Sequence, residues 1–163
     1  MSVFELLSAL ESSALGNALR AAGVWTYGVL NLGHVLGLCL LIGSVVLLDV
    51  RLLGGWRAIP LAAIARPTVP LAGLGLAIAL ATGICMVTVN ATEYYGNPFL
   101  LLKFGAIALG LVNVAVVTRL PAWRAKGERE PTAREATQLA IAGGISLFAW
   151  LAALTCGRMI AYW

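Results

Sequence analysis

The chain has 163 residues, of which 61% are hydrophobic and 11% are charged, against roughly 25% charged in soluble domains. A water-soluble fold cannot bury so much apolar surface, so most of the chain is expected to lie in a lipid bilayer. The net charge of +4 does not indicate a nucleic-acid partner, because the cations fall in short segments between apolar runs. Hydrolase and nucleotide-binding motifs with the flanks they require are missing, so these enzyme classes have no support.

The N-terminal stretch predicts an amphipathic helix over residues 2–17. Ser2 and Glu5 have the spacing of a capping box, which favours a helix start. Polar residues gather on one side of this helix and apolar residues on the other. The stretch is too polar to span, and we expect it to lie in the plane of the membrane interface.

Four apolar runs follow, and each is long enough to cross a hydrocarbon core of about 30 Å as a helix that rises 1.5 Å per residue. The segment between the first two runs holds Pro60, Pro67 and Pro70 and is expected to lie along the surface. The fold class is therefore all-α: a single-domain integral membrane four-helix up-down bundle with an interfacial helix at its N-terminus. The expected spans cover about residues 25–53, 70–90, 98–119 and 136–160.

The cations indicate an orientation. Only Arg20 and Arg158 fall at one edge of the bundle, whereas most cations fall in the two connections at the other edge. The positive-inside rule predicts that these connections are cytoplasmic and that both termini lie outside a bacterial inner membrane. The cations on this side, in the two connections or at the adjoining ends of the spans, are Arg51, Arg57, Arg66, Arg119, Arg124, Lys126, Arg129 and Arg134.

Two ionisable residues share one depth in the expected bundle. His34, the single histidine, and Lys103 each lie about 22 Å above the cytoplasmic end of their spans. An ionisable residue inside a membrane is costly and is a candidate functional residue. Two structural alternatives remain: Lys103 can snorkel to the outer interface, and His34 can hydrogen-bond a neighbouring helix with support from Asn31.

Haem b is one cofactor that this layer could hold, with His34 as the axial metal ligand. Gly37 lies one turn from His34 on the same face and would leave room for a flat macrocycle, although the same glycine could serve close helix packing. Lys103, Met86 or a partner subunit would supply a sixth ligand, or the sixth position would stay without one. Arg158 could meet Glu93 of the outer turn or an anionic group of the ligand.

Copper is the alternative metal, because cysteine and methionine are soft ligands that favour Cu(I). Soft side chains that could converge with His34 in the outer half are Cys85, Met86, Cys156 and Met159. At the opposite end, Asp49 is expected to form an ion pair with Arg119, which would clasp the first and third spans.

The chain resembles a group of uncharacterised small bacterial four-span membrane proteins. The residues that carry this resemblance are the pattern HVLGLxLLIGSxxLLDxRLLG from His34 to Gly54, NPFLLLKF at 97–104 and GRMIAYW at the end. More distantly, the chain is similar to HemJ-type protoporphyrinogen oxidases and CopD-type copper-resistance membrane domains. In the HemJ type, a histidine in the first span and a lysine entering a later span are associated with haem binding, and His34 and Lys103 match them by position. The HemJ type has an aromatic, proline-bearing stretch before an arginine where this chain has LLDVRLLG. The resemblance therefore implies a haem or porphyrin pocket rather than the oxidase reaction.

Three functions remain open from the sequence. The first is a membrane protein that binds haem b or porphyrin and has a redox role. The second is a small non-catalytic subunit that packs through its glycine faces into a homo-oligomer or a larger membrane complex. The third is a copper-handling membrane protein.

Overall fold

The computed structural model describes residues 2–163, and the N-terminal region forms two short helices, α1 (Val3–Glu11) and α2 (Ala14–Ala21). The capping box is present: the Glu5 amide donates to Ser2 Oγ, and the Ser2 amide donates to the Glu5 carboxylate. The single helix expected over 2–17 is wrong. Ser13 accepts a hydrogen bond from the Gly16 amide and thereby starts a second helix.

Four longer helices confirm the expected fold class, and each is long and apolar enough to cross a membrane. Two single-turn 3₁₀ helices, η1 (Ala91–Tyr94) and η2 (Ile160–Tyr162), and the short helix α6 (Pro121–Arg124) complete the chain. The four long helices are α3 (Val24–Leu52), α4 (Leu61–Val89), α5 (Pro98–Val117) and α7 (Ala133–Met159).

Helix α4 begins at Leu61, nine residues before the start expected from the sequence, so the surface segment predicted up to Pro70 is wrong. Pro60 caps the helix, and Pro67 and Pro70 lie inside it. A proline removes one backbone donor and disturbs the helix locally. Membrane helices tolerate this change because neighbouring groups and water can satisfy the freed carbonyls.

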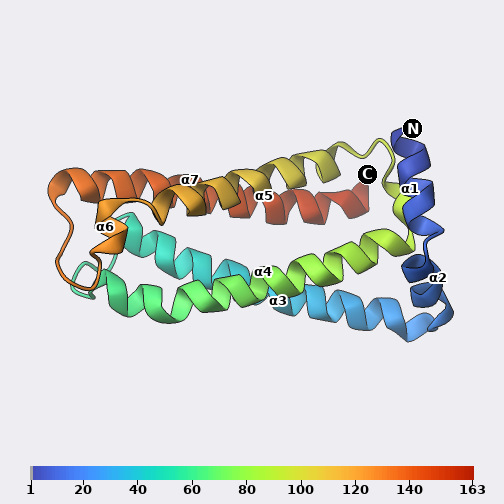
Figure 1. Ribbon diagram of the computed structural model, residues 1–163, viewed down its shortest axis with the longest axis horizontal. Helices are drawn as coiled ribbons and strands as arrows, with labels where there is room; N and C mark the ends of the chain where they lie inside the picture. Colours follow the sequence, from blue (N-terminus) through green and yellow to red (C-terminus); the bar gives the residue numbers. More distant parts are fainter. Residues whose placement is uncertain (1) are drawn as a thin grey trace.

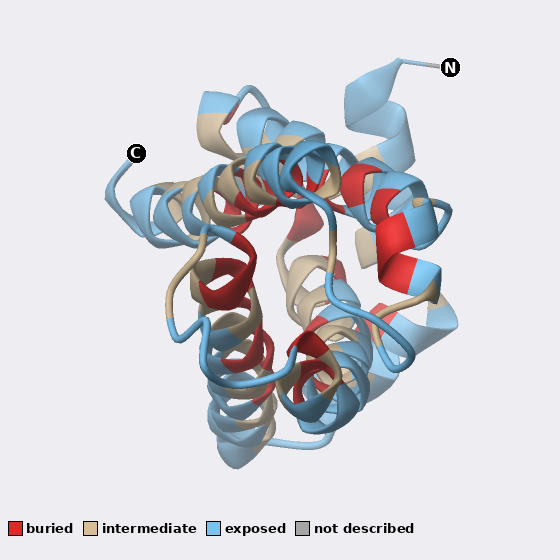
Figure 2. Ribbon diagram, turned by 90° about the vertical axis from the view of Figure 1, so that its left-hand side faces the viewer, coloured by how far each residue is buried: buried red, intermediate tan, exposed pale blue. Residues whose placement is uncertain are grey.

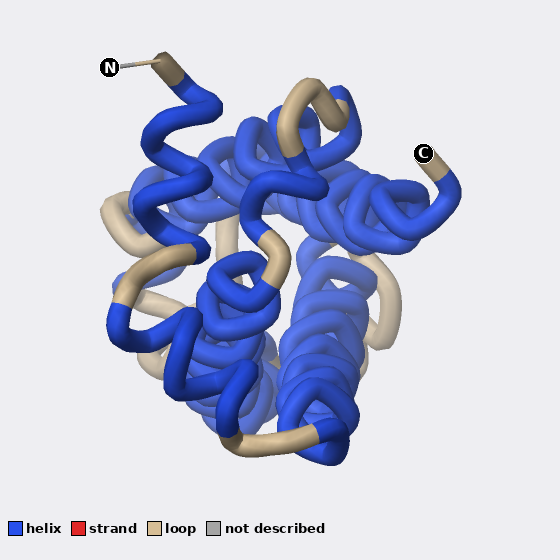
Figure 3. Tube along the Cα trace, turned by 90° about the vertical axis from the view of Figure 1, so that its right-hand side faces the viewer, coloured by secondary structure: helices blue, strands red, loops and turns tan. Residues whose placement is uncertain are grey.

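The helices pack as two antiparallel pairs, α3 with α4 and α5 with α7, which meet mainly where α3 contacts α7 (Figure 1). Both termini lie at one end of the bundle, together with α1, α2 and η1 (Figures 1 and 3). We call this the terminal end. The connections over residues 53–60 and 118–132 lie at the opposite end, which we call the arginine end.

Glycine allows the close approach of α3 and α4. A Cβ atom on Gly75 would lie 2.5 Å from the Leu41 amide nitrogen, and one on Gly37 would lie 2.8 Å from the Ala79 amide nitrogen. Real side chains do not tolerate such distances, so the two backbones touch only because both positions lack Cβ. Small residues bring membrane helices together in this way.

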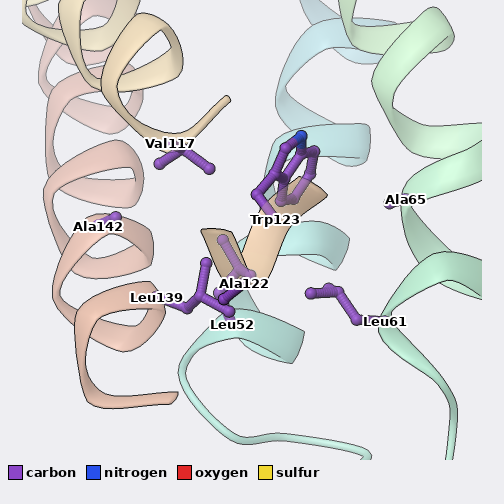
Figure 4. Close-up of a cluster of buried hydrophobic side chains, with 8 residues drawn as sticks. All are labelled: Leu52, Leu61, Ala65, Val117, Ala122, Trp123, Leu139 and Ala142. Carbon is purple, nitrogen blue, oxygen red and sulfur yellow. The ribbon is translucent and has the colours of Figure 1, made fainter. Parts of the chain in front are cut away.

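The larger cluster of buried apolar residues lies toward the arginine end, where α6 inserts Trp123 between the long helices (Figure 4). Along the bundle, buried residues occupy the faces that the helices turn toward one another (Figure 2). The outer faces carry large apolar side chains, such as Leu101 at 76% exposure and Phe148 at 70%. Such a surface fits a lipid environment. The core cluster comprises Leu52, Leu61, Ala65, Val117, Ala122, Trp123, Leu139 and Ala142.

Candidate functional site

Two cavities lie between the helix pairs, and side chains from all four long helices line each of them. The cavity nearer the terminal end encloses about 270 Å³ and contains His34; we call it the histidine cavity. The other encloses about 240 Å³ and contains Asp49; we call it the aspartate cavity. Leu41, Leu76 and Trp150 line both cavities and form the wall that they share.

His34 is held in one tautomer by α4. Its Nδ1 atom lies 3.1 Å from the Thr82 hydroxyl oxygen, and that hydroxyl donates its own proton to the Ile78 carbonyl at 2.7 Å. Thr82 must therefore accept from His34, which places the ring proton on Nδ1. The Nε2 atom keeps its lone pair and has no hydrogen-bond partner among residues 2–163. A neutral imidazole with one nitrogen fixed by a hydrogen bond and the other free is the usual state of a metal-ligating histidine.

Gly83 gives the imidazole its space. A Cβ atom at this position would lie 3.1 Å from His34 Cε1, which is closer than ordinary carbon contacts. The ring thus rests against the bare backbone of α4, next to Thr82. Thr82 and Gly83 were not predicted as site residues from the sequence. Only their depth could have indicated them, because they lie about two turns before the end of α4, opposite His34.

Lys103 lines the same cavity from α5, as the depth estimate predicted. Its side chain runs past α7 at Gly157, where a Cβ atom would lie 3.4 Å from Lys103 Nζ. The Nζ atom makes no hydrogen bond or ion pair within the described chain. The cavity therefore combines a free imidazole nitrogen and an unpaired amine with walls that are otherwise mostly apolar, including Leu38, Ile84, Phe104 and Trp150.

The other predicted ligands lie elsewhere. Gly37 packs against Gly75 and Ala79 of α4, so its missing side chain serves helix contact. Met86 is not among the residues that line the histidine cavity. Arg158 is exposed; it donates to the Tyr162 hydroxyl at 2.5 Å, and its guanidinium lies over that ring, so the expected contact with Glu93 does not form.

A copper cluster also gains no support from the geometry. In residues 2–163, no three side chains of histidine, cysteine, aspartate or glutamate come close enough together to hold a metal ion. Cys85 and Cys156 are half-buried free thiols, and Cys39 is exposed.

The first helix helps to close the histidine cavity, because Leu10 contributes to its wall. The neighbouring Glu11 carboxylate accepts hydrogen bonds from the Thr92 amide at 2.8 Å and the Thr92 hydroxyl at 2.7 Å. These bonds, the backbone one foremost, hold the pKa of Glu11 below its ordinary value. Arg20 of α2 makes a second contact between the N-terminal helices and α4, because its guanidinium donates to the Val89 carbonyl at the end of α4.

Asp49 does not pair with Arg119, so that expectation is wrong. Asp49 is buried in the aspartate cavity, and its Oδ2 atom has no hydrogen-bond partner in the described chain. Arg119 lies beyond the end of α5 and folds back to donate to the Ala115 carbonyl of its own helix. The two side chains diverge because one faces the bundle interior and the other the exposed connection.

Fold and cavities together define a class: a multi-pass membrane protein of four spanning helices with polar groups inside the bundle. The chain belongs to the DUF6644 family, a family of unknown function, which it matches over residues 6–163. No curated protein and no solved structure matches the chain.

Proposed function

We propose that this protein binds b-type haem in the histidine cavity and has a redox role, with His34 Nε2 as an axial ligand. The observation that carries the proposal is the hydrogen bond from His34 Nδ1 to Thr82, which leaves the Nε2 lone pair free on a side chain that lines a mostly apolar cavity. When bound, haem iron would supply one-electron transfer.

The chemical character of the side chains that line the cavity suits haem. Apolar side chains match the macrocycle, and the Lys103 amine could act as a second ligand or pair with a propionate. The volume of about 270 Å³ is just below the usual range for ligand pockets, about 300–1,000 Å³. The cavity gains further room on its α4–α5 side, where the lining residues Ile84 and Phe104 are more than half exposed. A macrocycle can therefore extend between these helices toward lipid.

For location, we propose a bacterial inner membrane with the arginine end in the cytoplasm and both termini outside. The cation-rich connections do lie together at one end of the bundle, opposite the termini (Figure 1). Labelling of single cysteines placed in residues 53–60 and near residue 163, from each side of sealed vesicles, tests the orientation.

Haem titration of the detergent-purified protein tests the cofactor. We expect wild type to bind haem with a defined stoichiometry, His34→Ala to lose at least 90% of it, and Thr82→Val to bind at least tenfold more weakly. Thr88→Val is the matched control, because Thr88 bonds only within α4 and contacts no histidine. Equal haem binding by wild type and His34→Ala would refute the proposal.

A further inference from the structure

The aspartate cavity contains an acidic group that the protein leaves without a counter-ion. Asp49 is 3% exposed, and its Oδ2 atom is buried without a partner. The ion pairs among residues 2–163 join Arg51 to Glu130 and Arg129 to Glu135, and neither involves Asp49. Burial of an uncompensated carboxylate is strongly unfavourable. Such a group on the wall of a cavity points to a ligand with positive charge.

Other groups in this cavity define the kind of cation. Ser146 and Asn113 line the cavity together with Asp49, and the Asn113 amide nitrogen donates to the Ala142 carbonyl at 3.0 Å. Most of the remaining wall is apolar and includes the indole rings of Trp123 and Trp150. Indole rings offer a large apolar contact area for the body of an organic cation. A hard metal ion would instead need about six or more oxygen ligands.

The size of the cavity also favours an organic ligand. An engineered apolar cavity of about 150 Å³ holds benzene, so the 240 Å³ here has room for a ring that carries an ammonium substituent. Two of the lining residues, Val69 of α4 and Val114 of α5, are 45% and 47% exposed. The cavity therefore opens between α4 and α5 toward the bilayer, where a lipophilic ligand would be dissolved.

We infer that the aspartate cavity binds a lipophilic monovalent organic cation, with its ammonium group at Asp49 and its apolar body against Trp123 and Trp150. The ligand enters laterally between α4 and α5. This site is separate from the proposed haem site, because Leu41, Leu76 and Trp150 stand between the two cavities.

Calorimetric titration of the full-length protein in detergent tests this inference with a matched pair of probes. Benzyltrimethylammonium carries the charge, and neopentylbenzene is its neutral carbon analogue. We expect wild type to prefer the cation at least tenfold and Asp49→Asn to lose that preference while it still binds the neutral probe. Glu128→Gln, which removes an exposed charge at the arginine end, should bind both probes like wild type.

Three results would overturn the inference: no binding of the cation, equal affinity of wild type for the two probes, or unchanged cation binding by Asp49→Asn. Saturable binding of sodium ion that depends on Asp49, without binding of the organic probe, would also overturn it. If Asp49→Asn does not fold, a substitution at the opening of the cavity between α4 and α5 still tests the inference. Val114→Trp should block both probes, whereas Val112→Trp, on the exposed face of the same helix and outside the cavity lining, should not.

Discussion

Substitution of Gly83 by alanine should disturb His34 without touching any polar group. The added Cβ would lie 3.1 Å from His34 Cε1, whereas carbon atoms in good contact are about 3.5 Å apart or more. The ring must therefore retreat by about 0.4 Å. That shift stretches the 3.1 Å bond between Nδ1 and Thr82 toward about 3.5 Å, close to the distance at which a hydrogen bond is lost. The lost bond costs about 0.5–1.5 kcal/mol, which offsets the gain of about 1 kcal/mol in helix propensity from glycine to alanine.

Nitrogen-15 NMR of histidine-labelled protein measures this effect directly, because His34 is the chain's single histidine. We expect wild type to show one tautomer with the proton on Nδ1, and Gly83→Ala to show a mixture with a substantial fraction protonated on Nε2. Gly73→Ala is the matched control on the same helix, because a Cβ there meets no atom within 4 Å. An unchanged tautomer in Gly83→Ala would refute the assignment of Thr82 as the group that orients the ring.

Three further predictions concern stability and docking. Gly75→Leu should lower the free energy of unfolding by about 1–3 kcal/mol or more, measured in detergent, because its Cβ would meet the α3 backbone at 2.5 Å; unchanged stability would contradict the close α3–α4 contact. Trp150→Ala should cost about 3–5 kcal/mol, since this side chain is 4% exposed; a loss below about 1 kcal/mol would contradict its place in the wall between the cavities. The pKa of Glu11 is lower in the folded state, so its contribution to the docking of α1 is complete above pH 4.5 and is lost as the pH falls further. Hydrogen exchange over residues 3–11 should therefore accelerate in acid for wild type and be fast at all pH values for Glu11→Gln; identical protection in both proteins would exclude this role of Glu11.

Hydropathy was sufficient to predict the all-helical membrane fold, because uninterrupted apolar runs of this length leave no other arrangement that satisfies the backbone in lipid. A simple count of helical rise also predicted that His34 and Lys103 share one layer, and both side chains line one cavity. Depth can be estimated from sequence because a helix rises by a fixed 1.5 Å per residue.

Other features depend on which faces of neighbouring helices meet, and this cannot be predicted from the local pattern of a single sequence. Pro67 and Pro70 argue locally against a helix, yet α4 continues through both. The partner of His34 is a threonine on a different helix, and nothing near Thr82 in the chain marks that role. Asp49 lies within α3 and is buried in the bundle, whereas Arg119 lies beyond the end of α5 and donates back to its own helix, a difference that the sequence pattern does not mark.

The visible absorption spectrum of the detergent-purified protein, produced with haem available and recorded oxidised and after reduction with dithionite, tests the central claim most directly. We expect a Soret band that shifts on reduction in wild type and is lost or strongly weakened in His34→Ala. A colourless wild type, or an identical band in both proteins, would contradict the assignment of His34 as the haem ligand.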